Sequence, residues 1–234
     1  MYLRLTLGLL AAIVLATTAL RAEDWPQWRG VDRDGNWTDT GIVKSFPDTG
    51  LKVTWRVPVG GGFAGPAVAG GRVFVLDYEE TPGSRTMDGT ERLLVLDEET
   101  GEILWSHEWP AAYRNISWKF ANGPRTPPTV ADGLVYVHGA AGMLSCLDTE
   151  TGDVVWQVDT GAEYGMTVPV YGISNAPLVE GDLLIAVVGG YPDAKIVAFD
   201  KTTGREAWRA LEMTSETGYS SPIVINAGGT RQLI

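Results

Sequence analysis

The chain is poor in the side chains that most metal-dependent and redox enzymes use. It has one cysteine, Cys146, and two histidines, His107 and His138. A single cysteine excludes an internal disulfide, and its place in an apolar segment predicts a buried core residue. The histidines lack partners at zinc-site spacing, and no G-x-S-x-G nucleophile elbow is present. The sequence therefore predicts no catalytic residue and no bound metal.

Basic residues are also scarce, because 18 Lys and Arg stand against 29 Asp and Glu, a net charge of -11. Phosphate binding requires a basic face, so we expect no nucleic-acid partner. The excess of acidic residues keeps an exported protein soluble.

Long apolar runs are absent except at the start, where Leu5–Ala19 follows Arg4 and a small residue, Ala22, precedes Glu23. This pattern predicts a secretory signal peptide over residues 1–22 and hence a periplasmic or extracellular protein. The run is shorter than the ~20 residues that a membrane-spanning helix needs, so we expect no membrane span after cleavage. An uncleaved anchor is the alternative. No cysteine stands at the cleavage site, so no lipid attachment is predicted.

A sustained amphipathic helical pattern is missing too, and 29 Gly with 13 Pro favour short strands joined by turns. What is present instead is a pattern, Asp-x-x-Thr-Gly-x-x-x-Trp, that occurs three times at intervals of 51 and 52 residues. A period near 50 indicates a propeller or solenoid. The positions are Asp97, Thr100, Gly101, Trp105, Asp148, Thr151, Gly152, Trp156, Asp200, Thr203, Gly204 and Trp208.

Each copy predicts a β-hairpin, in which the Asp side chain caps the turn and Gly supplies the positive φ. The Trp on the returning strand is large enough to wedge between neighbouring sheets. Trp55 stands 50 residues before Trp105, in phase with the series. We therefore expect Leu51–Val57 to be an orphan strand that completes the last blade of a closed ring.

The repeats align on Pro66, Pro128, Pro177 and Pro222, and each of these prolines is followed by two strand-like runs. The two strands around the Asp-x-x-Thr-Gly turn bring the number to four strands per repeat. Residues 51–234 are thus predicted to form an all-β propeller of four-stranded antiparallel blades. About four blades are present of an expected seven or eight. Because the last blade stops inside a strand at Ile234, we expect a C-terminally truncated fragment.

Residues 23–50 are irregular and carry Trp25, Trp28 and Trp37. This composition predicts an extended arm packed on the main body, with a ligand-stacking lid as the alternative. Asp32, Asp34 and Asn36 imitate the start of a calcium loop. However, Trp37 and Val43 stand where that loop needs Gly and Glu, so we expect no calcium there.

Gly60, Gly62 and Gly65 fit the dinucleotide pattern G-x-G-x-x-G, but Pro66 and a strand follow where a helix should begin. We expect these glycines to let a loop pass close to the propeller axis. We expect the residues just before the aligned prolines to converge near that axis, where they form a candidate ligand-binding set. The set is Arg125, Thr126, Ser174, Asn175, Tyr219 and Ser220. The alternative is that these side chains hydrogen-bond to neighbouring loops.

A long connection, residues 106–123, mixes aromatic and basic residues. Loops held on a rigid scaffold often bind partners. The candidate loop-binding residues are Trp109, Tyr113, Arg114, Trp118 and Lys119.

The repeats resemble the pyrroloquinoline-quinone (PQQ) type propeller repeat, which occurs in quinoprotein dehydrogenases and in the periplasmic scaffold BamB of the outer-membrane assembly machinery. Residues 24–30, 122–125 and 228–234 further resemble secreted PQQ-like repeat proteins of planctomycete-type bacteria. The resemblance implies the fold but no cofactor, because the repeat motif has a structural role.

A quinoprotein dehydrogenase would need calcium, an Asp base and, in many alcohol dehydrogenases, two adjacent cysteines, whereas this chain has one cysteine. We therefore expect an exported, non-catalytic scaffold that binds a protein or a small polar ligand without a cofactor. The alternative is a relative of PQQ-dependent dehydrogenases, using PQQ with calcium, whose catalytic half is missing from this chain.

Overall fold

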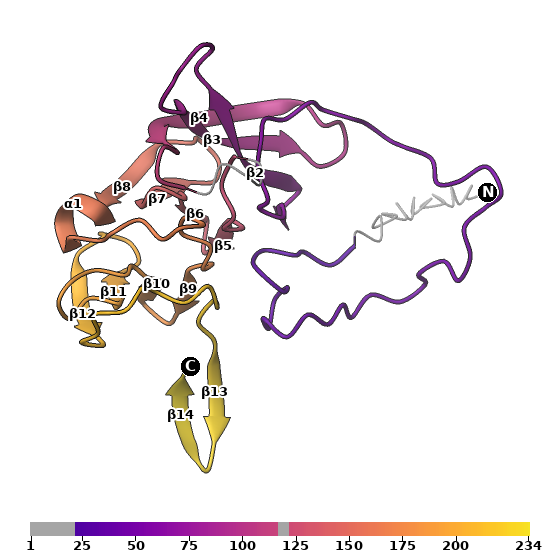
Figure 1. The fold of residues 1–234 in the computed structure, drawn as a ribbon. Helices are drawn as coiled ribbons and strands as arrows, with labels where there is room; N and C mark the ends of the chain where they lie inside the picture. The colour runs from indigo at the N-terminus through magenta and orange to yellow at the C-terminus, as the bar shows by residue number, and fades with distance from the viewer. Residues whose placement is uncertain (1–21, 117–121) are drawn as a thin grey trace, which may run out of the picture.

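The computed structural model describes residues 22–116 and 122–234 (Figure 1). Within these ranges the chain forms three four-stranded antiparallel sheets and one two-stranded sheet, each a meander of consecutive strands. This arrangement confirms the predicted all-β class, with about four propeller blades. Of the predicted signal peptide, residues 1–22, all but the last residue lie outside the described residues.

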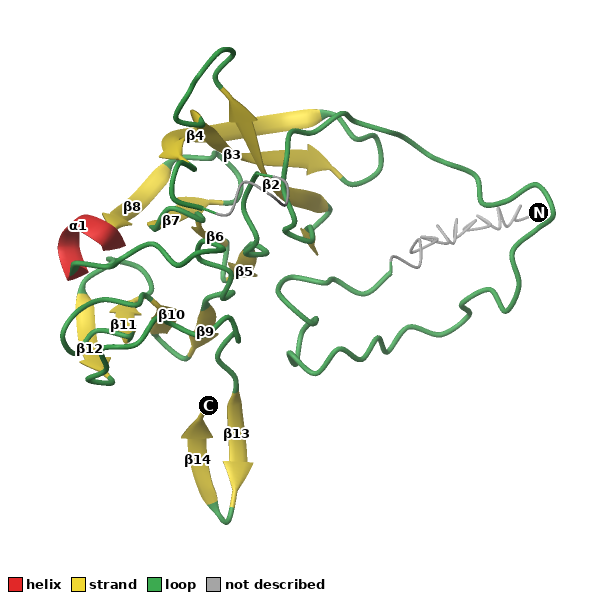
Figure 2. Ribbon diagram, in the orientation of Figure 1, coloured by secondary structure: helices red, strands yellow, loops and turns green. Residues whose placement is uncertain are grey.

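The strands divide into blades as the repeats predict (Figure 2). The first blade has β1 (Ala67–Ala69), β2 (Arg72–Glu80), β3 (Asp88–Asp97) and β4 (Ile103–Ala112). The second has β5 (Thr129–Ala131), β6 (Leu134–His138), β7 (Met143–Asp148) and β8 (Val154–Asp159), followed by the short helix α1 (Thr160–Tyr164). The third has β9 (Leu178–Glu180), β10 (Leu183–Val187), β11 (Ile196–Asp200) and β12 (Glu206–Ala210). The fourth has β13 (Val224–Ala227) and β14 (Thr230–Leu233).

The Asp-x-x-Thr-Gly pattern closes the hairpin between the third and fourth strands of each complete blade. In the second blade, Asp148 Oδ1 accepts hydrogen bonds from the backbone N–H of Glu150 at 2.8 Å and of Thr151 at 2.9 Å. Gly152 follows with φ 77°, the left-handed conformation that glycine adopts most readily. We call this end of the sheets the turn end, and the opposite end the loop end.

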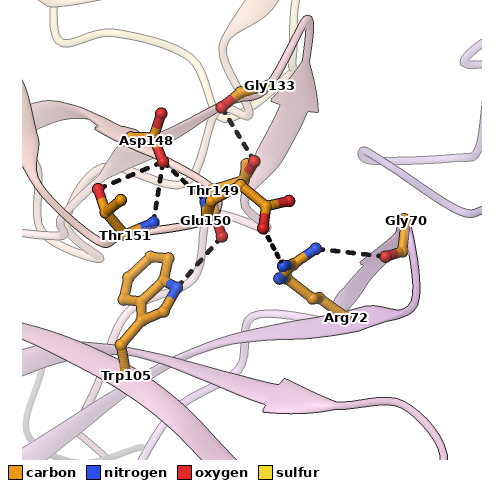
Figure 3. Close-up of polar contacts among 8 residues, drawn as sticks. All are labelled: Gly70, Arg72, Trp105, Gly133, Asp148, Thr149, Glu150 and Thr151. Carbon is orange, nitrogen blue, oxygen red and sulfur yellow. Dashed lines mark hydrogen bonds and ion pairs between the residues drawn. The ribbon is translucent and has the colours of Figure 1, made fainter.

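The Trp of the first two patterns joins one blade to the turn of the next, and Figure 3 shows this contact for Trp105. Trp105 Nε1 donates to the carbonyl of Thr149 at 3.2 Å, and Trp156 Nε1 donates to that of Lys201 at 3.0 Å. A Cβ on Gly152 would lie 2.8 Å from the Trp105 ring, so glycine is required there for space as well as for φ. The same residue type therefore closes the hairpin and receives the indole.

The segment Leu51–Val57 corrects one prediction. It forms no strand, because no described strand runs beside it to accept its backbone hydrogen bonds. Trp55 nevertheless makes the repeat contact: its Nε1 donates to Glu98 O at 2.8 Å, and its ring lies over Gly101. The predicted contact of the Trp55 indole is therefore confirmed, and the predicted strand is wrong.

Apolar side chains fill the spaces between blades. Phe74 and Leu76 pack against Val135 and Val137 between the first two blades. Cys146 belongs to the cluster between the second and third blades, where it is fully buried as predicted. Burial raises the pKa of its thiol to about 12.

The irregular arm lies partly against this body. Trp25 pairs with Val68 of β1 through an isolated antiparallel bridge, and Trp37 stacks on Trp25 with ring centroids 5.1 Å apart. The following residues, 38–50, leave the sheets in a wide loop whose Ile42 and Phe46 are exposed (Figure 1).

Candidate axial site

The innermost strand of each blade begins at the loop end, so the residues before β1, β5, β9 and β13 gather near the axis on that side. Close backbone packing holds the first of these segments in place. Phe63 N donates to Pro124 O at 2.8 Å, and a Cβ on Gly60 would lie 2.5 Å from Tyr78 O. Gly60 and Gly62 therefore allow close approach between backbones, whereas a Cβ on Gly65 would meet nothing within 4 Å.

Arg125 is the charged residue of the axial set. Its guanidinium carbon lies 4.4 Å from the Phe63 ring centroid and 5.9 Å from that of Tyr171. Nε and Nη2 are shielded from solvent and have no hydrogen-bond acceptor among the described residues. A guanidinium between two rings is favourable, but donors left without acceptors are costly.

Aromatic side chains extend this surface across three blades. Tyr171 and Tyr219 make an edge contact with ring centroids 5.6 Å apart. Phe63 is 50% exposed, and Tyr171 and Tyr219 are each 42% exposed. We call Phe63, Arg125, Tyr171 and Tyr219 the axial aromatic surface. Its four members come from segments far apart in the sequence.

Other members of the axial set tie neighbouring blades together. Asn175 Nδ2 donates to Gly218 O at 3.1 Å and to Ser220 O at 2.7 Å, and Thr126 Oγ1 donates to Ile173 O at 3.3 Å. Both side chains are buried, and their contacts match the structural alternative for the set. Ser174 is half-buried, whereas Ser220 is exposed.

The loop-binding candidates fare differently, because two of them are buried. Trp109 and Tyr113 are not surface residues: Trp109 Nε1 and Tyr113 Oη donate to the carboxylate of Glu91 at 2.8 Å and 2.5 Å. Arg114 is exposed. Trp118 and Lys119 lie outside the described residues.

Glu91 is the residue that the sequence interpretation missed. Its carboxylate is fully buried in β3 and accepts a third hydrogen bond, from Ala140 N of the second blade at 2.8 Å. Burial raises the pKa of Glu91, while the bonds from Tyr113, Ala140 and Trp109 oppose that rise. Glu91 shares a face with Leu93 and Val95, so strand alternation was the signal that could have revealed it.

The two histidines contribute no ligand cluster. His138 is fully buried, neither ring nitrogen has a described hydrogen-bond partner, and burial lowers its pKa to about 4. His107 Nε2 lies 3.2 Å from Gln157 Nε2, within hydrogen-bond distance. Among residues 22–116 and 122–234, no three His, Cys, Asp or Glu side chains gather closely enough to hold a metal ion.

The described part of the chain contains no helix long and apolar enough to cross a membrane.

Comparison with known proteins places these blades. The family profile described as outer membrane protein assembly factor BamB matches residues 41–118 and 90–234. BamB of Bordetella pertussis is 27% identical over 183 residues, which are 77% of this chain and 42% of the relative. The quinohemoprotein alcohol dehydrogenase ADH-IIG of Pseudomonas putida is 30% identical over 117 residues, 49% of this chain and 16% of that protein.

Among solved structures, the quinohemoprotein alcohol dehydrogenase of Comamonas testosteroni superposes with a TM-score of 0.57 and 25% identity, over 80% of this chain and 27% of its own. The chain spans less than half the length of each of these relatives. Since the family profile covers most of the sequence, including all four blades, the chain belongs to the family of the outer membrane protein assembly factor BamB.

Proposed function

We propose that this chain is part of an exported propeller that works by binding other proteins during outer-membrane assembly, without catalysis. The observation that carries the proposal is the family match over residues 41–118 and 90–234, which includes every blade. Its relatives in Bordetella pertussis and Burkholderia pseudomallei are named outer membrane protein assembly factor BamB.

The axial aromatic surface is the part of the molecule best suited to such binding. Aromatic residues and Arg are enriched at protein interfaces and supply most of their hot spots. Phe63, Tyr171 and Tyr219 are substantially exposed, and Arg125 lies against two of their rings. The buried ties of Thr126 and Asn175 hold these segments in fixed positions. A preformed surface of this kind loses little entropy on binding.

The test replaces Tyr171 by Ala in the full protein and measures its affinity for the purified outer-membrane assembly machinery. Tyr191→Ala is the matched control, because Tyr191 is 43% exposed against 42% for Tyr171, and its ring also contacts a cation, Lys195, at 4.2 Å. We expect the Tyr171 variant to bind about tenfold more weakly and the Tyr191 variant to bind normally. No binding by the unaltered protein would contradict the proposal.

A second candidate function is that of a PQQ-dependent dehydrogenase relative, and one specific observation favours it. Arg125 offers Nε and Nη2 without a described acceptor near the axis, and a guanidinium suits the carboxylates of PQQ. The described residues supply no set of three acidic, His or Cys side chains for calcium. Under this alternative, the calcium ligands and the base would lie elsewhere in a longer protein.

Calorimetry separates the two functions. PQQ is titrated into the full-length protein with calcium and, in parallel, with a chelator. Tight binding that the chelator abolishes would support the alternative. No heat at high PQQ concentration would count against it and leave the scaffold proposal standing.

A further inference from the structure

The N-terminal arm contacts the innermost strands of the first two blades and the segment just before the innermost strand of the third. Trp25 N donates to Val68 O of β1 at 2.8 Å, and Val68 N donates back to Trp25 O at 3.0 Å. Val130 N of β5 then donates to Pro26 O at 2.8 Å. Val68 and Val130 occupy the same position in their blades. The arm therefore runs along the free edges of these strands, which are the edges that face the propeller axis.

Arg33 extends the same contact to the third blade. Its Nη1 donates to Pro177 O at 3.0 Å and its Nη2 donates to Ala176 O at 3.1 Å, just before β9. Nη1 also bonds to the Gln27 side chain at 3.0 Å, which ties the guanidinium to the arm itself. The arginine is thus a bridge between the arm and the entrance of the third blade.

Holding Arg33 there is costly. The side chain is 6% exposed, its Nε has no described partner, and burial lowers its pKa to about 10. Its backbone has φ 55°, which a residue with a Cβ rarely adopts. Strain and desolvation of this kind persist only where surrounding contacts enforce them. The contacts that enforce them here are the two carbonyl groups of the third blade.

We propose that residues 24–35 form an intramolecular clamp on the axis side of the propeller. The clamp fixes the first three blades relative to one another, and it covers the inner edges of β1 and β5. Arg33 fastens its far end. A ligand or partner that approaches the axis therefore meets the axial aromatic surface at the loop end, while the covered edges are closed to it.

The arm supplies its own control in Arg29. Arg29 and Arg33 both lie over the Trp28 ring, with guanidinium carbons 5.4 Å and 5.3 Å from its centroid, and both have positive φ. Arg29 Nη2, however, donates to Asp34 O within the arm, at 2.6 Å. Both variants remove a contact with Trp28, but Arg33→Ala also removes a buried guanidinium, its bond to Gln27 and the link to the third blade.

A thiol at position 129 reports whether the clamp is closed. Thr129 Oγ1 donates to the same Pro177 carbonyl as Arg33, at 2.9 Å, and Thr129 is 1% exposed. Thr129→Cys is introduced into the full protein with either arginine variant, and thiol labelling is followed. Buried Cys146 serves as the internal marker of global unfolding.

With Arg33→Ala, we expect the thiol at position 129 to label about tenfold faster than with Arg29→Ala, while Cys146 stays unlabelled. The amides of Val68 and Val130 should also exchange faster with deuterium, because they donate to the arm. Equal labelling and equal exchange in the two variants would overturn the clamp.

A second experiment covers the case in which Arg33→Ala does not fold. A protease site is inserted at Gly41, in the exposed loop, and the folded protein is cleaved there. Because Gly41 follows the clamp in sequence, its severed fragment should remain bound to the blades during size-exclusion chromatography. Release of the fragment from an otherwise folded body would contradict the proposal.

Discussion

The two ends of the blades are built in different ways. At the turn end, Asp148 and its counterparts Asp97 and Asp200 each accept bonds from their own turn, and this arrangement recurs from blade to blade. At the loop end the described contacts vary more. A buried carboxylate, Glu91, joins the first blade to the second, whereas the later blades are joined by Thr126 and Asn175, which donate to carbonyl groups of the following blade. The repeated end supplies the fold, whereas the variable end has room for differences that function requires.

Among the substitutions that test this difference between the two ends, Glu91→Ala should have the largest effect on the free energy of unfolding. It would leave Trp109, Tyr113 and Ala140 N–H without their shared acceptor, and we expect a loss of about 3 to 5 kcal/mol in the free energy of unfolding. Urea denaturation measures it. Glu91→Gln keeps one acceptor oxygen and should lose less. An unchanged midpoint for Glu91→Ala would mean that the loop end contributes little to stability.

Trp156→Ala tests the turn end in the same way. The indole is buried between the second and third blades, and its Nε1 bonds to Lys201 O. Removing it should lower the free energy of unfolding by about 3 kcal/mol. Thermal unfolding followed by calorimetry checks this value, and a loss no larger than that of Trp37→Ala, an exposed control, would contradict the packing of Trp156 between the blades.

His138→Leu should stabilise the protein. Register places Leu76 and Val187 at the same position of the other blades, so an apolar residue fits there. His138 has a pKa lowered to about 4, below its unfolded value of about 6.5. The unfolded state therefore binds more protons between these values, and the stability contributed by neutral His138 falls as the pH drops from about 6.5 to about 4.

The pH dependence separates this account from simple repacking. The stability difference between His138→Leu and the unaltered protein should widen on acidification across that window, by up to about 3 kcal/mol. Denaturant midpoints at several pH values provide the measurement. A difference that stays constant with pH would show that His138 does not titrate as a buried neutral group.

Glu150→Ala should have the smallest effect. Its carboxylate pairs at 2.5 Å with Arg72, which belongs to the first blade, whereas Glu150 belongs to the second (Figure 3). Glu150 is largely exposed. Exposed pairs of this kind contribute about 0 to 1 kcal/mol, and salt screens them. A larger loss that persists at high salt would mean that the turn end depends on charge as well as on its repeated turns.

The sequence predicted the turn end well because its chemistry is local. An Asp side chain that bonds to N–H groups two and three residues on, and a glycine with positive φ, need no information from elsewhere in the chain. Trp55 shows the limit of this reasoning. Its spacing predicted the indole contact, but strand formation also requires a neighbouring strand, which the spacing could not supply.

The loop end was harder to predict because its contacts are long-range. Trp109 and Tyr113 belong to a stretch whose mixed composition suggested a binding loop. The neighbouring sequence gave no sign that both side chains donate hydrogen bonds to the buried carboxylate of Glu91. The candidate axial residues also turned out to have different roles, because their contacts are long-range. Asn175 reaches the carbonyls of Gly218 and Ser220, whereas Arg125 has aromatic neighbours and keeps two donors without a described acceptor.

The most direct test of a structural turn end and a binding loop end is one paired measurement on Arg125→Ala and Trp105→Ala. For each variant, the free energy of unfolding and the affinity for the outer-membrane assembly machinery are determined. We predict that Trp105→Ala loses about 2 to 3 kcal/mol of stability and keeps its affinity at temperatures where it is folded. Arg125→Ala should keep its stability and bind about tenfold more weakly. A stability loss with unchanged affinity for Arg125→Ala would contradict the account.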